Sequence, residues 1–170
     1  ETPHLDWLLL TKRPENFLKF APWTGQWPEN VWALTSAENQ EQAHKRNPEL
    51  LKVPAHVRGL SIEPLLGPIT LPPIHQCKKR TPDGGETTLT IKAVGVCSHC
   101  PRCGASVNAK SSLDWIIVGG ESGPAARPMH PQWVRSLRDQ CIAAKVAFHF
   151  KQWGEWCPWD FETTWSPNDH

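Results

Sequence analysis

The chain has 170 residues, 39% of them hydrophobic, and a formal net charge of +1. This length allows one domain with a sizeable core. The near-zero charge excludes a global attraction to nucleic acid or anionic membranes and leaves only local patches for such contacts. No apolar run approaches the ~20 residues that span a bilayer, and no signal peptide is visible. We therefore expect a cytoplasmic protein with no membrane partner, and the start at Glu1, directly before a strand, indicates a fragment of a longer product.

Five short apolar runs, each followed by polar residues, dominate the chain in sequence order. Continuous apolar runs of this length are typical of parallel strands that are buried on both faces. Strands are therefore predicted at 7–10, 31–34, 57–62, 115–118 and 147–150.

Helices are predicted between these strands. A short helix at 15–20 follows the first strand. A second helix has Ser36 as its N-cap and runs until Asn47-Pro48 interrupts it, after which Glu49–Lys52 could add another turn. A third helix at 131–145 is amphipathic. Its apolar stripe contains Trp133, Val134, Leu137, Cys141 and Ile142.

The pattern divides the chain into four segments. Residues 1–71 hold the first three βα units, and residues 113–152 hold the last two. Between them, residues 72–112 form a Cys-rich insert, with a weak alternation at 86–94 that predicts a small hairpin. Residues 153–170 are a Trp/Pro-rich tail.

The insert predicts a metal site. Cys100-Pro101-Arg102-Cys103-Gly104 has the form of a zinc knuckle. With Cys97 and Cys77 it offers four thiolates to a structural zinc ion, and the absence of a secretion signal favours a metal over disulfides. His75 or His99 could replace one thiolate. An iron–sulfur cluster remains the alternative, because the Cys97, Cys100 and Cys103 spacing matches part of the bacterial ferredoxin pattern.

The insert has two candidate roles. As a clip, the metal folds a segment too small to have its own core. As a nucleic-acid reader, it would contact phosphates through its basic residues, which are Lys78, Lys79, Arg80, Lys92, Arg102 and Lys110. We favour the clip, because small inserts are often basic for solubility.

Polar residues at the ends of the strands form the candidate ligand site. In α/β proteins the carboxyl ends of parallel strands gather at one edge, where ligands bind. Lys12 and Arg13 suit a carboxylate or phosphate, and Gly119-Gly120 would let backbone approach a ligand. Each residue alone has an ordinary explanation; their recurrence at five strand ends predicts the site. The remaining candidates are Ser36, Glu38, Asn39, Glu63, Glu121, Ser122, Lys151, Gln152 and Trp153.

These motifs together resemble a known family. The segments that carry the resemblance are 8–16, 31–40, 60–68, 115–131 and 150–156, among them Leu-Ser-Ile-Glu-Pro-Leu-Leu-Gly-Pro and Trp-Ile-Ile-Val-Gly-Gly-Glu-Ser-Gly-Pro-Ala-Ala-Arg-Pro-Met-His-Pro. The family is a phage- and prophage-associated group of unknown function, related to radical-SAM barrel proteins. The resemblance covers nearly everything except the Cys-rich insert and the tail.

The resemblance implies that the chain is the C-terminal part of a barrel. Longer members carry an N-terminal Cys motif for a [4Fe–4S] cluster and S-adenosylmethionine, which this chain lacks. It therefore looks like a partial TIM-like (β/α) barrel of about five strands with a zinc-ribbon-like insert. Radical chemistry is not expected from this chain alone. By similarity, Ser36 and Asn39 would lie near the cofactor ribose, and Gly119, Gly120 and Glu121 near its adenosine or the substrate.

We accordingly expect a nucleotide- or nucleic-acid-related function in a bacterium or phage-infected host, with Glu63, Glu121 and Lys151 as the catalytic candidates. The alternative is a non-catalytic, zinc-containing binding or assembly module that contacts nucleic acid or a partner protein. The open edge of a partial barrel needs cover, which predicts a missing N-terminal half or a homodimer.

Overall fold

The computed structural model describes residues 2, 4–23, 26–71, 75–80, 86–91, 113–158 and 165–167. The chain divides into two compact units. The first comprises Glu1–Thr70 and Leu113–His170, and the second comprises Leu71–Ser112.

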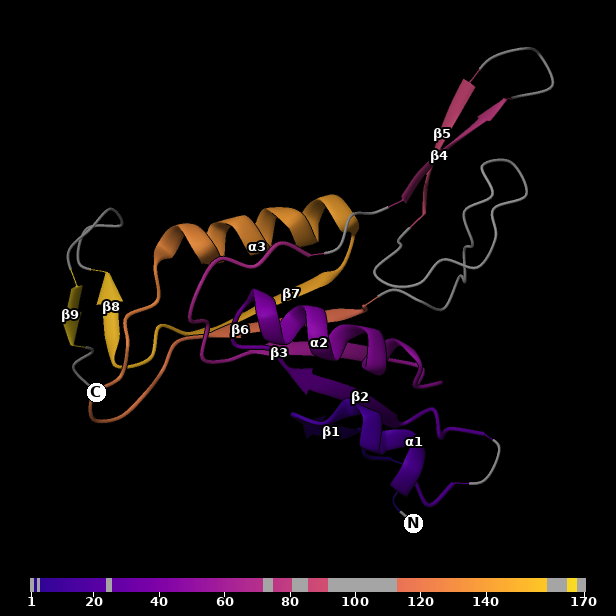
Figure 1. Cartoon of the computed structure of the whole chain (residues 1–170), viewed down its shortest axis with the longest axis horizontal. Coiled ribbons are helices and arrows are strands. Elements are labelled where there is room, and N and C mark those ends of the chain that lie inside the picture. The colour runs from indigo at the N-terminus through magenta and orange to yellow at the C-terminus, as the bar shows by residue number, and fades with distance from the viewer. Residues whose placement is uncertain are drawn as a thin grey trace. The chain divides into compact units, whose positions relative to one another are not determined.

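The first unit is built on a five-stranded parallel sheet. Its strands are paired in chain order, so that β1 and β7 are the two edges (Figure 1). The predicted α/β class and parallel sheet are confirmed. The predicted partial TIM-like barrel is not confirmed, because the sheet is open. The strands are β1 (Trp7–Thr11), β2 (Val31–Ser36), β3 (Arg58–Ile62), β6 (Trp115–Gly119) and β7 (Ala147–Gln152).

Three of the four connections between neighbouring strands carry the helices of the described chain, and the connection from β3 to β6 carries the second unit. Crossovers between parallel strands are right-handed in nearly all proteins, so strands laid down in one direction place their helices on one face of the sheet. The burial agrees, because Ala33, Leu60 and Ile116 on one face are fully buried. The connecting helices are η1 (Pro14–Asn16, a 3-10 turn), α1 (Phe17–Phe20), α2 (Gln40–Leu51) and α3 (Pro131–Ala144).

The opposite face of the sheet is apolar but only partly covered. Leu8 is 47% exposed and Leu10 is 54% exposed on β1. Trp32 and Trp115 stack edge-to-face with their ring centroids 5.9 Å apart, and both are half-buried. The core therefore lies between the sheet and its helices, and the other face presents apolar side chains at the β1 edge.

The strands continue beyond the apolar runs that predicted them. β1 includes Thr11, β2 includes Thr35 and Ser36, and β7 includes Lys151 and Gln152. The ladder is made by backbone N–H and C=O groups and does not depend on side-chain polarity. Polar side chains at the strand ends are therefore held by regular sheet geometry.

The second predicted helix is wrong in two details. Its N-cap is Asn39, whose Oδ1 accepts from the N–H of Gln42 at 3.0 Å, and not Ser36, which ends β2. The helix also continues through Pro48 to Leu51. Pro48 has no N–H to donate to the preceding turn, but Leu50, in the last turn, is completely buried, and this packing keeps the turn helical.

Helix α3 is close to its prediction. It begins after His130, whose Nδ1 accepts from the N–H of Gln132 at 3.2 Å, and it buries Val134, Leu137 and Cys141. Ile142 was wrongly assigned to the buried stripe and is 67% exposed, because it lies about 100° around the helix from Cys141. Cys141 is a core residue, and burial raises the pKa of its thiol to about 11.

Two hairpins complete the described chain. In the second unit, β4 (His75–Arg80) pairs antiparallel with β5 (Glu86–Ile91). In the first unit, β8 (Trp156–Pro158) pairs antiparallel with β9 (Trp165–Pro167). Among the described residues, no helix is long and apolar enough to cross a membrane.

Candidate functional site

Residues from three strands meet at the carboxyl edge of the sheet. Glu63 follows β3, and its carboxylate accepts hydrogen bonds from Lys151 Nζ at 3.0 and 3.1 Å and from Gln152 Nε2 at 3.1 Å. The same amide of Gln152 lies 3.3 Å from Ser122 Oγ. We call Glu63, Gly119, Ser122, Lys151 and Gln152 the Glu63 cluster. It joins the ends of β3, β6 and β7, as the sequence predicts for parallel strands.

Gly119 allows this cluster to form. The Glu63 side chain lies over the end of β6, and a Cβ on Gly119 would lie 2.9 Å from Glu63 Cδ and 2.9 Å from its Oε1. Any other residue at this position would push the carboxylate away from Lys151 and Gln152. Gly119 therefore makes room for a side chain of the chain itself.

Gly120 makes room for backbone. A Cβ there would lie 1.7 Å from the carbonyl oxygen of Trp153. A Cβ on Gly154, whose φ is 84°, would lie 2.2 Å from the Glu121 carbonyl oxygen. The crossing is fixed by two backbone hydrogen bonds, Gly120 N–H to Gln152 O at 3.0 Å and Glu155 N–H to Glu121 O at 2.8 Å. The Trp153 ring packs on Phe150 with their centroids 4.9 Å apart.

Glu121 is held by Arg127. The guanidinium donates to Oε2 from Nε at 2.8 Å and to Oε1 from Nη2 at 2.7 Å, and the Arg127 backbone N–H donates to Oε2 at 2.9 Å. These hydrogen bonds, the side-chain pair first, lower the pKa of Glu121 to about 2. At neutral pH Glu121 is an ionised carboxylate that closes a loop. This geometry favours a structural role over the transfer of a proton.

A second cluster lies at the ends of β1 and β2. Glu38 accepts from Lys12 Nζ at 2.5 Å and from Arg46 Nη1 at 2.8 Å. Arg46 also donates to the Ser36 carbonyl at 2.8 Å. Burial alone would raise the pKa of Glu38, but the hydrogen bond from Lys12, with the charge of Arg46, lowers it overall. The Glu38 carbonyl accepts from the N–H of Leu66, three residues after Glu63, at 2.8 Å, so the two clusters are contiguous.

The polar residues near Glu38 differ in whether their side chains can contact a ligand. Ser36 is buried, and the side chain of Asn39 caps α2. Arg13 is exposed, and within the described part of the chain its guanidinium makes no hydrogen bond or ion pair. Of the charged residues predicted at the strand ends, Arg13 is therefore the one whose side chain forms no ion pair among the described residues.

A family model described as "Protein of unknown function (DUF5131)" matches residues 1–167. The chain belongs to this family. No curated protein and no solved structure matches it. The DUF5131 match includes both units and all the strand-end residues, but it assigns them no activity, so any function must be argued from geometry and chemistry.

Only one of the four predicted cysteine ligands of this DUF5131 chain lies among the described residues. Cys97, Cys100 and Cys103 lie outside the described residues. Cys77 lies on β4, opposite Leu89. In the described ranges, no group of three or more His, Cys, Asp or Glu side chains could hold a metal ion.

The sequence analysis of this DUF5131 chain missed two arginines, Arg46, which binds Glu38, and Arg127, which binds Glu121. Arg46 could have been found, because it lies two helical turns after the start of α2, on the face that carries Asn39 and Ala43. Arg127 lies six residues after Glu121 in an irregular loop, and no periodicity relates the two.

Proposed function

We propose that this chain is the ligand-binding part of a phage-associated, radical-SAM-type barrel protein that acts on a nucleotide or nucleic acid. The observation that carries the proposal is the Glu63 cluster at the carboxyl edge of a parallel sheet paired in chain order. Chain-order pairing is the arrangement of a (β/α) barrel wall, and its carboxyl edge is where such proteins bind ligands.

The Glu63 cluster can exchange partners with a polar ligand. Lys151 is 53% exposed and Glu63 is 21% exposed, so a ligand can reach both. Gln152 would keep the carboxylate in place while Lys151 turns toward an anionic group. A hydroxyl or amino group on the ligand would then donate to Glu63, which makes both residues substrate contacts.

S-adenosylmethionine does not fit the residues that the resemblance implies for it. Asn39 caps α2, Ser36 is buried, and Glu121 is closed by Arg127. The space above Gly119 and Gly120 holds Glu63 and the Trp153 backbone. We therefore assign to the chain the binding of the nucleotide or nucleic acid, and we assign it no reaction step that uses S-adenosylmethionine.

NMR titration of the ¹⁵N-labelled protein with adenosine 5′-monophosphate and with a short single-stranded oligonucleotide tests the proposal. Amide shifts are expected at Gly119, Ser122 and Gln152, with about tenfold weaker binding in Glu63→Gln. Asp139→Asn, which removes an equal charge from an exposed pair on α3, is the control and should bind like wild type. Unchanged binding by Glu63→Gln would overturn the proposal.

A structural zinc ion in the insert belongs to the same proposal, with Cys77, Cys97, Cys100 and Cys103 as its ligands. Metal analysis of anaerobically purified protein should give one zinc per chain and no absorption band near ~400 nm. If the analysis finds iron and sulfide, the zinc proposal is wrong and the insert holds an iron–sulfur cluster.

The second candidate function is a binding or assembly module without catalysis. The exposed apolar side chains at the β1 edge favour it, because such surfaces mark interaction sites. Light scattering should then detect a homodimer that Leu8→Glu dissociates. A monomer at all concentrations would remove self-association from consideration.

A further inference from the structure

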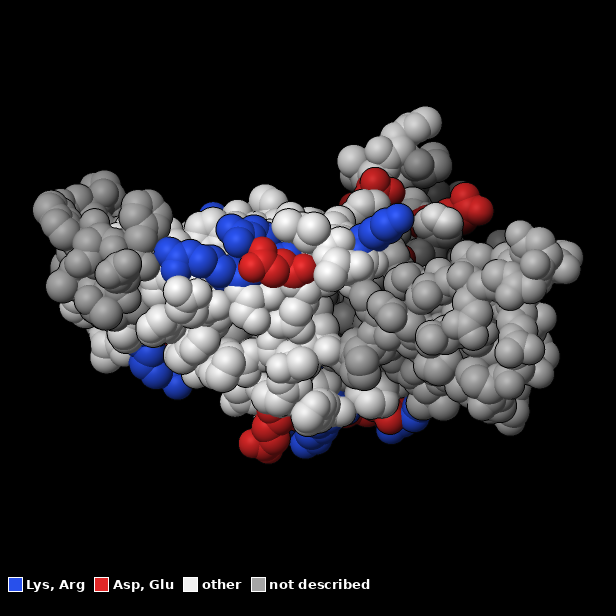
Figure 2. Space-filling view, turned by 90° about the horizontal axis from the view of Figure 1, so that it is seen from above, with Lys and Arg blue, Asp and Glu red and all other residues white. Residues whose placement is uncertain are grey.

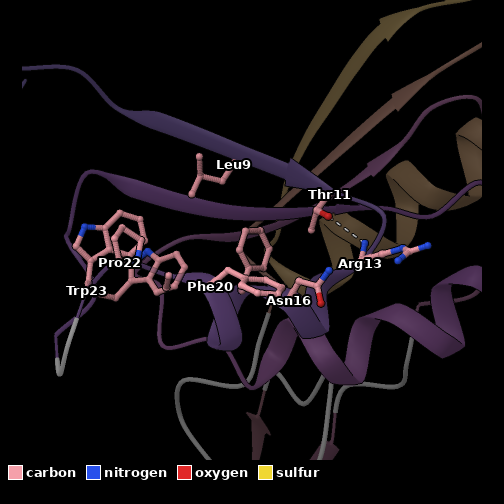
Figure 3. A pocket seen from close by; sticks show the side chains of 10 residues that line it. Leu9, Thr11, Arg13, Asn16, Phe20, Pro22 and Trp23 are labelled. Atoms are coloured by element: carbon pink, nitrogen blue, oxygen red, sulfur yellow. Dashed lines mark hydrogen bonds between the residues drawn. The ribbon is translucent and has the colours of Figure 1, made fainter.

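An aromatic groove lies between β1 and α1. Its walls include Leu9, Phe17, Phe20, Trp23 and Trp27, and its volume is about 230 Å³ (Figure 3). Trp27 is its rigid base, because this residue is only 8% exposed and its Nε1–H donates to the Val31 carbonyl at 2.6 Å. The ring of Phe17 lies edge-on to Trp27 at 5.9 Å, and that of Trp23 lies at 4.7 Å.

The groove has an accessible aromatic surface. Phe20 is 76% exposed, and Trp23 is only half-buried. Packing explains Trp27, but it does not explain why the largely exposed ring of Phe20 lines the same groove as Trp23. Flat aromatic surfaces of this kind accept planar rings, above all the bases of nucleotides.

One end of the groove is polar. Thr11, Arg13 and Asn16 line it, and the Arg13 N–H donates to Thr11 Oγ1 at 3.0 Å, which fixes the backbone at the start of η1 (Figure 3). Arg13 thus stands on an ordered backbone with an uncommitted guanidinium.

Arg13 also lines a second, charged hollow of about 700 Å³ between η1 and α2. This volume lies within the roughly 300–1,000 Å³ typical of small-molecule sites. Four cations and two carboxylates line it, namely Lys12, Arg13, Lys45, Arg46, Glu15 and Glu49.

The charges of this hollow are not balanced. Lys12 and Arg46 are committed to Glu38, and Glu49 is committed to Lys52. In the described chain, Arg13 and Lys45 have no ion-pair partner, and Glu15 is the only lining carboxylate left to oppose them. An anionic group would therefore find two unpaired cations here.

Positive and negative side chains are interspersed on this protein, so its charge acts only over short distances. Figure 2 shows Lys and Arg lying beside Asp and Glu among uncharged residues on the described part of one face. A net charge of +1 provides no broad basic field, so affinity for an anion depends on particular side chains such as Arg13 and Lys45.

We propose that the aromatic groove and the charged hollow form one site for a nucleotide unit, with the base against Phe20 and Trp23 and the phosphate between Arg13 and Lys45. Arg13 belongs to both hollows, which connects the two. A guanidinium offers a phosphate two parallel hydrogen bonds, and an ammonium adds a point charge. The inference rests on the proposed function for the class of substrate and adds the place where that substrate is recognised.

The nucleotide unit has two sources, a free nucleotide or a residue of a single strand. Isothermal titration calorimetry with adenosine 5′-monophosphate, adenosine, inorganic phosphate and a short oligoadenylate separates them. A free-nucleotide site binds the monophosphate more tightly than adenosine or phosphate alone. A strand site binds the oligonucleotide and not the monophosphate. Either result supports the proposal, and binding of none of the four overturns it.

Variants locate the site. Arg13→Ala with Lys45→Ala should weaken binding about tenfold or more and flatten its salt dependence, because two phosphate contacts are lost. Phe20→Ala should weaken binding by roughly fivefold through lost stacking. The matched controls are Arg138→Ala, an exposed arginine on α3, and Leu18→Ala, an exposed apolar residue on α1 outside the groove.

The outcomes distinguish this inference from the proposed function. Full affinity in the Arg13/Lys45 double variant overturns the inference. Affinity lost in that variant but kept in Glu63→Gln supports the inference and removes the Glu63 cluster from the substrate site. Circular dichroism and thermal unfolding of each variant exclude a folding defect as the cause of lost binding.

Discussion

The two ends of the carboxyl edge of the sheet both hold paired carboxylates, Glu38 at one end and Glu63 at the other, but they differ in whether unpaired cations stand beside the pair. At the β3–β6–β7 end, Glu63 is bound by Lys151 and Gln152, and Glu121 is bound by Arg127. At the β1–α2 end, Arg13 and Lys45 have no ion-pair partners in the described chain. Both ends look alike in sequence, as apolar runs followed by polar residues. The difference teaches that polar strand ends of the same sequence pattern can hold either a formed ion pair, which a ligand must displace, or an unpaired charge, which a ligand can meet directly.

Gly120→Ala should have the largest effect, because it breaks the crossing that supports the Glu63 end. The new Cβ would lie 1.7 Å from the Trp153 carbonyl oxygen, so the ends of β6 and β7 must separate. We expect a loss of about 3 kcal/mol or more in the free energy of unfolding, measured by urea denaturation.

Gly67→Ala is the matched control for this glycine. No atom lies within 4 Å of a Cβ at Gly67, so the expected change is within about 1 kcal/mol of wild type. Equal losses in the two variants would contradict the steric explanation.

A double-mutant cycle of Glu63→Gln and Lys151→Met measures how strongly the Glu63 end is closed. Because Lys151 is about half-exposed, we expect a coupling energy of about 0.5–1 kcal/mol. The exposed Glu49–Lys52 pair on α2 should give about 0.3 kcal/mol. A coupling no larger than that of the control pair would show that the cluster is not preorganised.

The Glu121–Arg127 pair makes the stability of the β3–β6–β7 end depend on pH. Hydrogen bonds from Arg127 lower the pKa of Glu121 from its ordinary value of 4.5 to about 2. A lowered carboxyl pKa contributes stability that is fully present above the ordinary value and is lost as the pH falls toward 2. In Arg127→Met, the pKa of Glu121 should return toward its ordinary value in an NMR titration. The same titration in Arg138→Met should leave it low.

The smallest effect on stability is expected at the β1–α2 end. Arg13→Ala and Lys45→Ala remove no ion pair seen in the described residues, so each should change the free energy of unfolding by less than about 0.5 kcal/mol. A much larger loss in the free energy of unfolding, in the same urea experiment, would mean that these cations stabilise the fold. The two ends of the edge would then not differ in the way described.

The sequence predicts the parallel sheet well, because buried strands are continuous apolar runs and β6, Trp-Ile-Ile-Val-Gly, is one of them. It predicts that Glu63 and Lys151 share an edge for the same reason. It does not predict which charges are neutralised, because Arg127 and Glu121 meet in an irregular loop. Nor does it predict that Gly119 and Gly120 admit the chain's own atoms instead of a ligand. Such contacts depend on distances between segments that no local pattern specifies.

The position of the second unit in the chain has a consequence for folding. Residues 71–112 separate β3 from β6, yet these strands are hydrogen-bonded neighbours, and Leu71 and Leu113 beside the junctions are buried. The entropy of closing a loop rises only with the logarithm of its length, so about 40 extra residues cost roughly 1–2 kcal/mol. The sheet can therefore tolerate wide variation in the length of this segment, which makes it a natural place for sequence change.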